Sequence, residues 1–396
     1  MAGRIPARWI ALSIFTLATA LSFLDRQVLA ALAPEIQEEF GLNNKQYGYL
    51  LSVFSILYAG GAPMLGLFID RAGLNIGISL SVGVWSLAGM ATGFAGGYAG
   101  LLGCRAALGL AESGGIPANG KAVATYLLPR ERALGAGLGQ IGISLGMVTA
   151  PVLASGLAVA YGWRSAFVVT GALGFLWIPL WLWTSRALPA DAVEPAPAPK
   201  LAAMVGDPRL WALVAANILG MTVYSLWINW TTVFLVNTQG LTPQDANQRL
   251  AWIPPLFAAL GGLAGGWLSM RLARAGWDLL DARRRVCLLS TLALLVTAAV
   301  PHIPSAALAT AAICWSFFWA VAFSVNLYAM PIDMFGAERA AFGVSALTCA
   351  YGFMQTFLSP LIGDGIDRAG FGPVCGVVAV LPLAAVAILY FARRKR

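Results

Sequence analysis

Long apolar segments separated by short polar breaks follow one another along almost the whole chain. A helix needs about 20 consecutive apolar residues to cross a bilayer, and twelve segments of that kind can be placed. They cover residues 8–34, 46–69, 75–97, 99–127, 132–159, 163–186, 208–237, 249–273, 285–302, 305–332, 340–366 and 372–392. The runs are continuous and do not alternate every second residue, which favours helices over a barrel. The pattern therefore predicts an all-α membrane protein with twelve transmembrane helices.

One long polar break lies near the middle of the chain. Residues 187–207 are rich in proline, alanine and charge, a composition typical of a linker. Six predicted spans lie on either side of it. We therefore expect two six-helix bundles, residues 1–186 and 208–396, joined by a cytoplasmic linker and enclosing a central cavity, the repeat plan of many secondary transporters.

Composition and charge narrow the class of protein further. The chain is 59% hydrophobic and 11% charged, whereas soluble proteins carry about 25% charged residues. Eighteen of the 25 Lys and Arg residues fall on the side of the N-terminus and four on the opposite side. This asymmetry predicts a multi-pass protein of a bacterial inner membrane with both termini in the cytoplasm. The net charge of +8 therefore encodes topology, and we expect no nucleic-acid partner.

Residues that could form a catalytic or metal centre are scattered. The five cysteines are Cys104, Cys287, Cys314, Cys349 and Cys375, and the one histidine is His302. Isolated cysteines inside apolar runs indicate neither a disulfide framework nor a metal cluster, and no nucleophile stands with a base. We expect a protein that is not an enzyme and has no cofactor and no metal.

Four charged residues lie deep inside predicted spans, where an ionised group costs at least ~2.5–3.5 kcal/mol, whereas we expect Lys121 of the fourth span to lie near its cytoplasmic end. Asp25 and Arg26 lie in the first span, and Arg105 and Glu112 in the fourth. Helix neighbours point about 100° apart, so Asp25 and Arg26 need partners on other helices. One interpretation is that the arginines hold an anion while the carboxylates load and release a proton. The alternative is a structural network of salt bridges that locks the first helix to the fourth.

Small residues recur at helical spacing in both halves. They form the stripes Gly135/Gly139, Gly142/Gly146/Ala150 and Gly261/Gly265. Stripes of this kind let transmembrane helices approach closely. They predict packing contacts and no chemistry.

Five segments carry a resemblance to a known family. They are Phe23-Leu-Asp-Arg26, Arg105-Ala-Ala-Leu-Gly-Leu-Ala-Glu112-Ser-Gly-Gly-Ile-Pro117-Ala-Asn119, Tyr161-Gly-Trp-Arg164-Ser-Ala-Phe167, Trp227-Ile-Asn229-Trp230 and Ser324-Val-Asn326-Leu-Tyr328. They resemble the major facilitator superfamily, and within it the anion:cation symporter family, which contains bacterial hexuronate and galactonate transporters. The likeness runs through nearly the whole chain, and the Arg105–Asn119 stretch is its most specific part.

The resemblance implies roles for particular residues. It implies that Arg26 binds the substrate carboxylate, that Asp25 and Glu112 couple transport to protons, and that Arg105 interacts with Glu112. The further substrate-binding candidates are Tyr58, Gln140, Asn229, Trp319 and Asn326. Family members commonly have Tyr two positions before the Asp, where this chain has Phe23.

We therefore expect a proton-coupled symporter, functioning as a monomer in the lipid bilayer, that imports a small carboxylate such as a hexuronate or an aldonate by alternating access. A monocarboxylate transporter, an organic anion exchanger and a transporter-like sensor are the alternatives. A drug/proton antiporter is disfavoured because a buried Arg repels cations. An organophosphate antiporter is disfavoured because the seventh span has no second buried basic residue.

Overall fold

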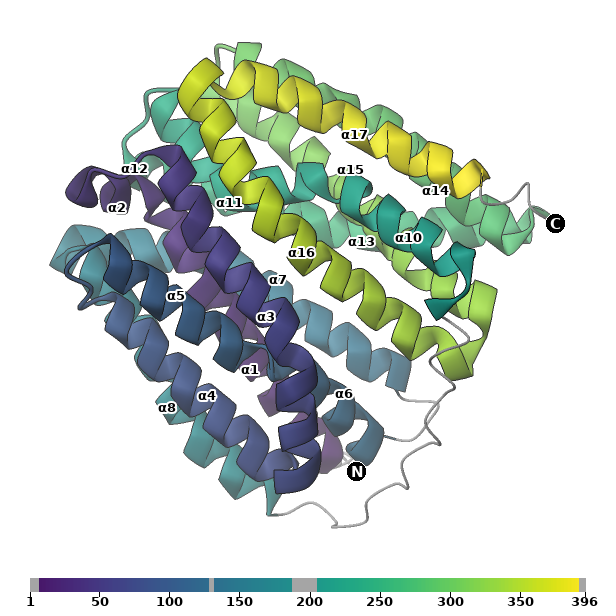
Figure 1. The fold of residues 1–396 in the computed structure, drawn as a ribbon, viewed down its shortest axis with the longest axis horizontal. Helices are drawn as coiled ribbons and strands as arrows, with labels where there is room; N and C mark the ends of the chain where they lie inside the picture. The colour runs from purple at the N-terminus through teal and green to yellow at the C-terminus, as the bar shows by residue number, and fades with distance from the viewer. Residues whose placement is uncertain (1–6, 128–131, 187–204, 392–396) are drawn as a thin grey trace, which may run out of the picture. The chain divides into compact units, whose positions relative to one another are not determined.

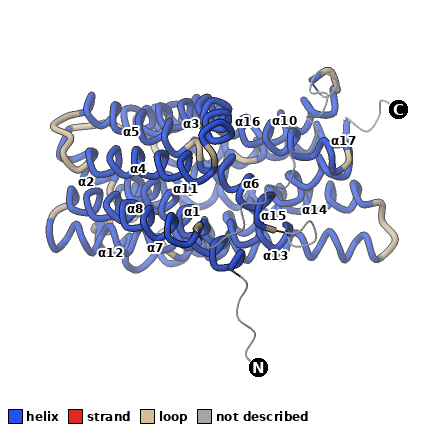
Figure 2. The backbone as a smooth tube through the Cα atoms, turned by 90° about the horizontal axis from the view of Figure 1, so that it is seen from below, coloured by secondary structure: helices blue, strands red, loops and turns tan. Residues whose placement is uncertain are grey.

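The computed structural model describes residues 7–127, 132–186 and 205–391, and every regular element in these ranges is a helix (Figures 1 and 2). Most of the predicted linker, residues 187–204, lies outside the described residues, as do Arg4, Arg130 and the basic residues at 393–396 that contributed to the predicted topology. The all-α class predicted from the sequence is confirmed for the described ranges.

The helices follow one another with short connections. They are α1 (Ala7–Ala31), α2 (Ala33–Phe40), α3 (Asn44–Ala72), α4 (Leu74–Thr92), α5 (Tyr98–Glu112), α6 (Gly115–Tyr126), α7 (Arg132–Tyr161), α8 (Trp163–Ser185), α10 (Pro208–Gly220), α11 (Thr222–Asn237), α12 (Pro243–Asp245), α13 (Ile253–Arg274), α14 (Leu279–Leu294), α15 (Ala306–Phe335), α16 (Ala337–Ala369) and α17 (Phe371–Phe391). A π-helical turn at Ala246–Ala251 precedes α13, and a 3-10 helix at Leu295–His302 extends α14.

Ten helical segments of the described part are long and apolar enough to cross a membrane. The two other predicted spans also fall on helix, but each departs from a simple apolar run. The 99–127 segment is divided into α5 and α6, and the 340–366 segment lies in α16, whose last two turns contain Asp364, Asp367 and Arg368. A count of twelve spans therefore stays a prediction.

The contacts divide the chain into two compact units. Unit 1 consists of residues 1–42 and 49–195, and unit 2 consists of residues 43–48 and 196–396. Within unit 1, α1 packs on α7 and α4 packs on α8, and within unit 2, α13 packs on α15 and α10 packs on α17. Aromatic side chains fill the core of unit 1, where Phe15 packs edge-on against Trp181, which stacks on Trp177. In unit 2 the core forms around Phe323 and its aliphatic neighbours.

The predicted glycine stripes lie at close helix contacts in each unit. A Cβ atom on Gly142 of α7 would lie 2.6 Å from the carbonyl oxygen of Thr16 on α1. One on Gly265 of α13 would lie 2.7 Å from Cα of Ala322 on α15. Only glycine permits such an approach of two backbones. The packing role predicted for these stripes is therefore confirmed.

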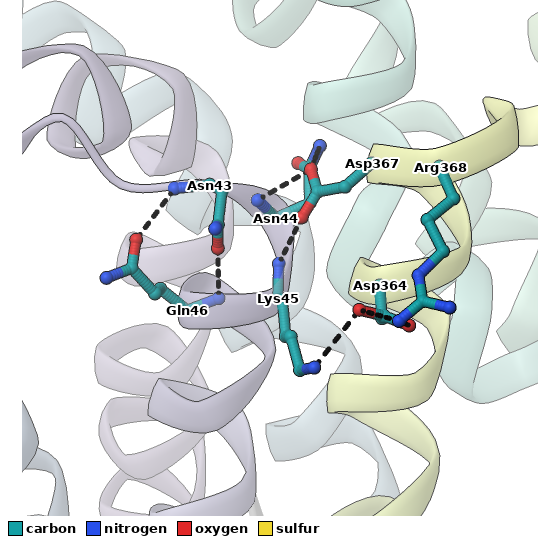
Figure 3. A network of polar contacts seen from close by, with 7 residues as sticks. All are labelled: Asn43, Asn44, Lys45, Gln46, Asp364, Asp367 and Arg368. Carbon is teal, nitrogen blue, oxygen red and sulfur yellow. Dashed lines mark hydrogen bonds and ion pairs between the residues drawn. The ribbon is translucent and has the colours of Figure 1, made fainter.

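The first residues of α3 belong to unit 2 by their contacts, whereas the rest of this helix belongs to unit 1. Asp367 of α16 caps the N-terminus of α3. Its carboxylate accepts hydrogen bonds from the backbone N–H of Asn44 at 3.0 Å, that of Lys45 at 2.9 Å and the Asn44 side chain at 2.8 Å (Figure 3). The first N–H groups of a helix have no partner within it and attract negative charge, so a carboxylate is well suited to this position.

Other contacts reinforce this junction, which we call the α3 clasp and define as residues 43–48 together with Asp364, Asp367 and Arg368. Asp364 forms ion pairs with Lys45 at 3.1 Å and with Arg368 at 2.9 Å (Figure 3). The fully buried Tyr47 donates a hydrogen bond of 2.9 Å to the carbonyl of Asn229. The start of α3 is thus held by a helix cap, by ion pairs and by a buried hydrogen bond.

Candidate functional site

Two helices of unit 1 hold the four charged side chains that the sequence places inside predicted spans. Asp25 and Arg26 lie on α1, and Arg105 and Glu112 lie on α5. Asp25, Arg105 and Glu112 are at most 4% exposed, and the side chain of Arg26 is 17% exposed. Charges so far removed from water need partners, and their contacts determine the chemistry open to this site.

The helix is interrupted directly after Glu112. Glu112 is the last residue of α5, and α6 starts at Gly115 after the turn at Ser113 and Gly114. Pro117 lies in the first turn of α6, where a residue without an N–H is tolerated because that N–H has no partner within the helix. The predicted fourth span is therefore two helices, and Glu112 lies at the junction between them.

Arg26 and Glu112 form a buried ion pair between α1 and α5. Arg26 Nε lies 2.5 Å from Glu112 Oε2. The Ser22 hydroxyl donates to the same carboxylate oxygen at 2.9 Å and accepts from Arg26 Nη2 at 3.3 Å. The other oxygen, Glu112 Oε1, is buried without a hydrogen-bond partner among the described residues. Glu112 Oε1 is therefore not engaged in the ion pair with Arg26. It is an oxygen that could carry a proton, since a carboxyl group gains a donor when it is protonated.

Three aromatic rings surround the Arg26 guanidinium, and we call Phe23, Phe54 and Tyr58 the aromatic cage. The Arg26 Cζ atom lies 4.7 Å from the ring centre of Phe23, 5.0 Å from that of Phe54 and 4.3 Å from that of Tyr58. A planar, weakly hydrated guanidinium is stabilised by such faces. The cage fixes Arg26 through α1 and α3 while leaving the edge of the guanidinium to its hydrogen-bond partners.

Asp25 points toward a different part of unit 1. A Cβ atom on Gly89 of α4 would lie 4.0 Å from Asp25 Oδ2. Asp25 Oδ1 is buried without a hydrogen-bond partner in the described ranges, and Asp25 takes part in none of the ion pairs found there. The neighbours Asp25 and Arg26 therefore point toward different helices, α4 and α5, as expected for consecutive residues of an α-helix.

Arg105 approaches the same site from α5. Its Cζ atom lies 4.6 Å from the ring centre of Phe54, so one ring of the cage contacts two guanidinium groups. The family resemblance implied that Arg105 interacts with Glu112. Glu112 forms its hydrogen-bonded ion pair with Arg26, and Arg105 also acts electrostatically on Glu112 and on Asp25. The role implied for Arg105 stays a prediction.

The other predicted ligands are placed differently. Tyr58 belongs to the cage, whereas Gln140 on α7 has an exposed side chain. In unit 2, Asn326 is fully buried and donates to the carbonyls of Gly265 and Ala322 on α13 and α15. The side-chain amide of Asn326 thus links α15 to α13 through these two hydrogen bonds.

Two further unit 2 candidates also face protein groups. Asn229 donates to the carbonyl of Ser225 at 2.9 Å, and its own carbonyl receives the Tyr47 hydroxyl. Trp319 packs against the rings of Trp315 and Phe318. Its Nε1 atom and Oδ1 of Asn326 are buried without a hydrogen-bond partner among the described residues. Substrate binding by the unit 2 candidates stays a prediction.

Sequence reasoning missed Ser22 and Phe54 in unit 1 and the hydrogen bond from Ser225 to Gln355 in unit 2. A signal existed for the first two. Ser22 precedes Arg26 by four residues, and Phe54 precedes Tyr58 by four, so each lies on the same helix face as a predicted site residue. Nothing in the sequence pairs Ser225 of α11 with Gln355 of α16. No group of three potential metal-ligating side chains occurs in the part of the chain that the structure describes.

A polytopic bundle with paired charges buried between two helices defines a membrane transporter more readily than any other class of protein. The family model of the Major Facilitator Superfamily matches residues 15–359. The chain belongs to this superfamily. Its members are transporters and not enzymes, which confirms the prediction that the protein is not an enzyme.

Relatives and a solved structure agree with this assignment. The chain is 27% identical over 404 residues to the hexuronate transporter of Escherichia coli K12. This alignment covers 97% of this chain and 93% of the relative. It is 28% identical over 282 residues to the galacturonate transporter of Dickeya chrysanthemi, covering 66% of this chain and 81% of the relative. The fold matches the inward-facing, occupied crystal structure of a bacterial homologue of the human lysosomal transporter Spinster. The TM-score is 0.82 at 21% identity, over 100% of this chain and 98% of the other.

Proposed function

We propose that the protein is a proton-coupled symporter that imports a small organic anion of the sugar-acid class, such as a hexuronate or an aldonate. The relatives described above are transporters of hexuronate and galacturonate. A monoanion with several hydroxyl groups also suits a site with one caged arginine and hydroxyl-bearing neighbours, because these groups can both donate and accept hydrogen bonds.

The observation that supports this proposal most directly is the Arg26–Glu112 ion pair. Arg26 Nε is engaged by Glu112 Oε2 at 2.5 Å, so a substrate carboxylate and the Glu112 carboxylate compete for one guanidinium. Protonation of Glu112 removes its negative charge and weakens its hold on Arg26. Arg26 is then available to the carboxylate of the substrate, and the aromatic cage keeps the guanidinium in place during the exchange.

Asp25 supplies the second proton site in this proposal. Its carboxylate is buried on the α4 side of α1 and has an oxygen without a hydrogen-bond partner in the described ranges. Burial away from water disfavours the charged form of a carboxylate, and protonation removes that cost. The substrate anion and its proton thus bind at adjacent positions of one helix.

We place the protein in the inner membrane with both termini in the cytoplasm, on the strength of the Lys and Arg asymmetry in the sequence. Import then begins at the opposite face. A single chain is the transporting unit in this proposal, because both predicted six-helix bundles lie within one chain.

Uptake into proteoliposomes tests the proposal. Radiolabelled glucuronate, galacturonate and galactonate are offered to vesicles with an imposed inward proton gradient, and with the gradient collapsed by a protonophore. We expect accumulation of at least one sugar acid above equilibrium only with the gradient present. Uptake that is indifferent to pH but depends on an anion inside the vesicle would identify an exchanger instead.

Glu112→Gln separates proton coupling from substrate binding in the same vesicles. This variant keeps the shape of the side chain but carries no charge to be neutralised by a proton. We expect loss of gradient-driven accumulation with substrate counterflow retained within about tenfold, the equivalent of 1.4 kcal/mol. Unaltered accumulation by Glu112→Gln would exclude Glu112 as a coupling residue.

A further inference from the structure

The turn between α13 and α14 concentrates arginine at one end of unit 2. Five arginines, Arg271, Arg274, Arg283, Arg284 and Arg285, come from the last turn of α13 and the first two turns of α14. The connection is tight because Gly276 adopts φ +93°, a left-handed conformation that favours glycine. Asp278 then caps α14 by accepting from the backbone N–H of Leu280 at 3.2 Å.

Two of these arginines are neutralised by carboxylates. Arg283 forms an ion pair with Asp333, and Arg284 forms one with Asp281 at 3.1 Å. The other three, which we call the free arginines, are Arg271, Arg274 and Arg285. All three are exposed, and none has a carboxylate within 4.0 Å among the described residues.

Two of the free arginines lie over exposed tryptophan rings. Arg271 Cζ is 5.1 Å from the ring centre of Trp267, and Arg285 Cζ is 3.6 Å from that of Trp277. The two tryptophans are 53% and 42% exposed. Tryptophan beside arginine at the end of an apolar helix is typical of the headgroup region of a bilayer.

Helix electrostatics explains only part of this cluster. Arg271 and Arg274 lie in the last turn of α13, where a cation is stabilised by the helix dipole. Arg285 lies in the second turn of α14, near the end of the helix that favours anions, so it gains nothing from the dipole. The equivalent turn of unit 1, between α3 and α4, has no tryptophan in residues 70–75, and its Asp70 pairs with Lys121 at 2.9 Å.

We propose that the free arginines, with Trp267 and Trp277, bind the phosphate of an anionic phospholipid such as phosphatidylglycerol. Guanidinium groups bind phosphate through paired hydrogen bonds, and the two rings align them with the headgroups. Exposed apolar side chains border the arginines, with Met270 45% and Leu279 42% exposed. Acyl chains cover such side chains, whereas a free phosphate ion leaves them in water. This site is independent of the solute that the protein transports.

Lipid-dependent thermal stability tests the proposal. The full chain in a neutral detergent is heated with added phosphatidylglycerol, phosphatidylcholine or inorganic phosphate. We expect a larger rise in Tm with phosphatidylglycerol than with phosphatidylcholine, and none with inorganic phosphate at the same concentration. The variant Arg271→Gln/Arg274→Gln/Arg285→Gln should lose this difference, with an affinity for phosphatidylglycerol lower by on the order of 100-fold at low salt.

Matched variants keep the test decisive where the triple variant does not fold. Arg285→Gln is compared with Arg249→Gln, whose arginine is also exposed but already forms an ion pair with Asp245 at 3.0 Å. Native mass spectrometry counts the phosphatidylglycerol molecules retained by each. We expect fewer on Arg285→Gln and the wild-type number on Arg249→Gln. Equal retention by both variants, or a Tm rise with inorganic phosphate alone, would overturn the proposal.

Discussion

The two units bury different kinds of polar side chain. Unit 1 encloses Asp25, Arg105 and Glu112, together with the nearly buried Arg26. In the described part of unit 2 the buried polar side chains are amides and hydroxyls, apart from one arginine. They are Asn217, Thr222, Ser225, Asn229, Thr231, Thr232, Asn247, Ser269, Arg284, Ser290, Thr291, Thr297, Thr310, Ser316, Asn326, Gln355 and Ser359. The exception, Arg284, lies near the start of α14 and pairs with Asp281, beside the partly buried ion pair of Arg283 with Asp333.

This difference separates two uses of polarity within one fold. Charge in unit 1 can change with protonation and can attract an anion, whereas the amides of unit 2 keep the same charge at every pH. Two of these amides bind backbone carbonyls of other helices, Asn217 that of Leu347 at 2.7 Å and Asn326 that of Gly265 at 3.0 Å. We infer that unit 1 holds the ionic chemistry and that the amides of unit 2 mainly hold its helices together.

The largest effect is expected at Arg26. Arg26→Ala removes the guanidinium and leaves the Glu112 carboxylate buried without its cation, so we expect uptake to fall by at least about 100-fold, about 2.7 kcal/mol. Arg26→Lys keeps the charge but loses the planar contact with the aromatic cage and should recover only a small part. Initial rates of sugar-acid uptake measure both. Uptake by Arg26→Ala within a factor of two of wild type would contradict the inference that unit 1 holds the ionic chemistry.

Close packing should matter equally in the two units. Gly142→Ala places a methyl group against the Thr16 carbonyl, and Gly265→Ala places one against Ala322. Each should lower stability by about 1–3 kcal/mol, as overpacking does, and thermal unfolding in detergent measures it.

Each packing variant has a control on its own helix. Gly156 on α7 and Gly266 on α13 have nothing within 4 Å of an added Cβ atom. Gly156→Ala and Gly266→Ala should therefore leave Tm unchanged or raise it slightly, because alanine is the better helix former. If Gly142→Ala and Gly156→Ala behave alike, the close approach of α7 to α1 is not needed for stability.

A smaller effect is expected at Asn326. Asn326→Leu removes a hydrogen bond between α13 and α15, and such bonds between membrane helices are worth about 0.6 kcal/mol on average. Tm should fall slightly, while the pH dependence of uptake stays that of the wild type. A shifted pH profile would show that an amide of unit 2 takes part in the ionic chemistry.

The smallest effect concerns an exposed pair, where the two units should behave alike. Hydrogen bonds from Arg164, and then from Trp163, lower the pKa of Glu39 on α2, and Arg209 likewise lowers the pKa of Asp207 before α10. A lowered pKa adds stability above the ordinary carboxyl pKa, and this stability is lost as pH falls through the lowered value. Glu39→Gln should thus cost at most about 1 kcal/mol at neutral pH, with the cost vanishing in acid. A cost that is constant with pH would exclude the ion pair as its source.

Hydrophobic patterning was enough to predict the helices, because a membrane-spanning helix needs a long apolar run and tolerates few charges. It did not predict the break between α5 and α6, although Gly114 and Pro117 mark it, since the apolar composition continues through it. It also could not show that α3 begins within unit 2, because that depends on contacts with residues more than 300 positions away.

The sequence predicts which charged residues belong to the site, but not which of them form ion pairs with one another. The cost of burying charge singles out Asp25, Arg26, Arg105 and Glu112 without any structure. That Glu112 forms its hydrogen-bonded ion pair with Arg26 depends on the packing of helices far apart in the sequence, which no periodicity encodes. The unit 2 candidates Asn229 and Asn326 came from segments that resemble the family. Both donate to backbone carbonyls, a use of amides that a sequence does not distinguish from ligand binding.

The α3 clasp has a consequence for taking the protein apart. Residues 43–48 belong to unit 2 although they precede the rest of unit 1 in the chain. A cut in the linker therefore yields two fragments of which the second lacks six residues of its own fold. Fragment complementation would then have to restore the Asp367 cap between separate chains. Chimeras that exchange halves with a relative inherit the same demand, since the start of α3 and the end of α16 must come from matching parents.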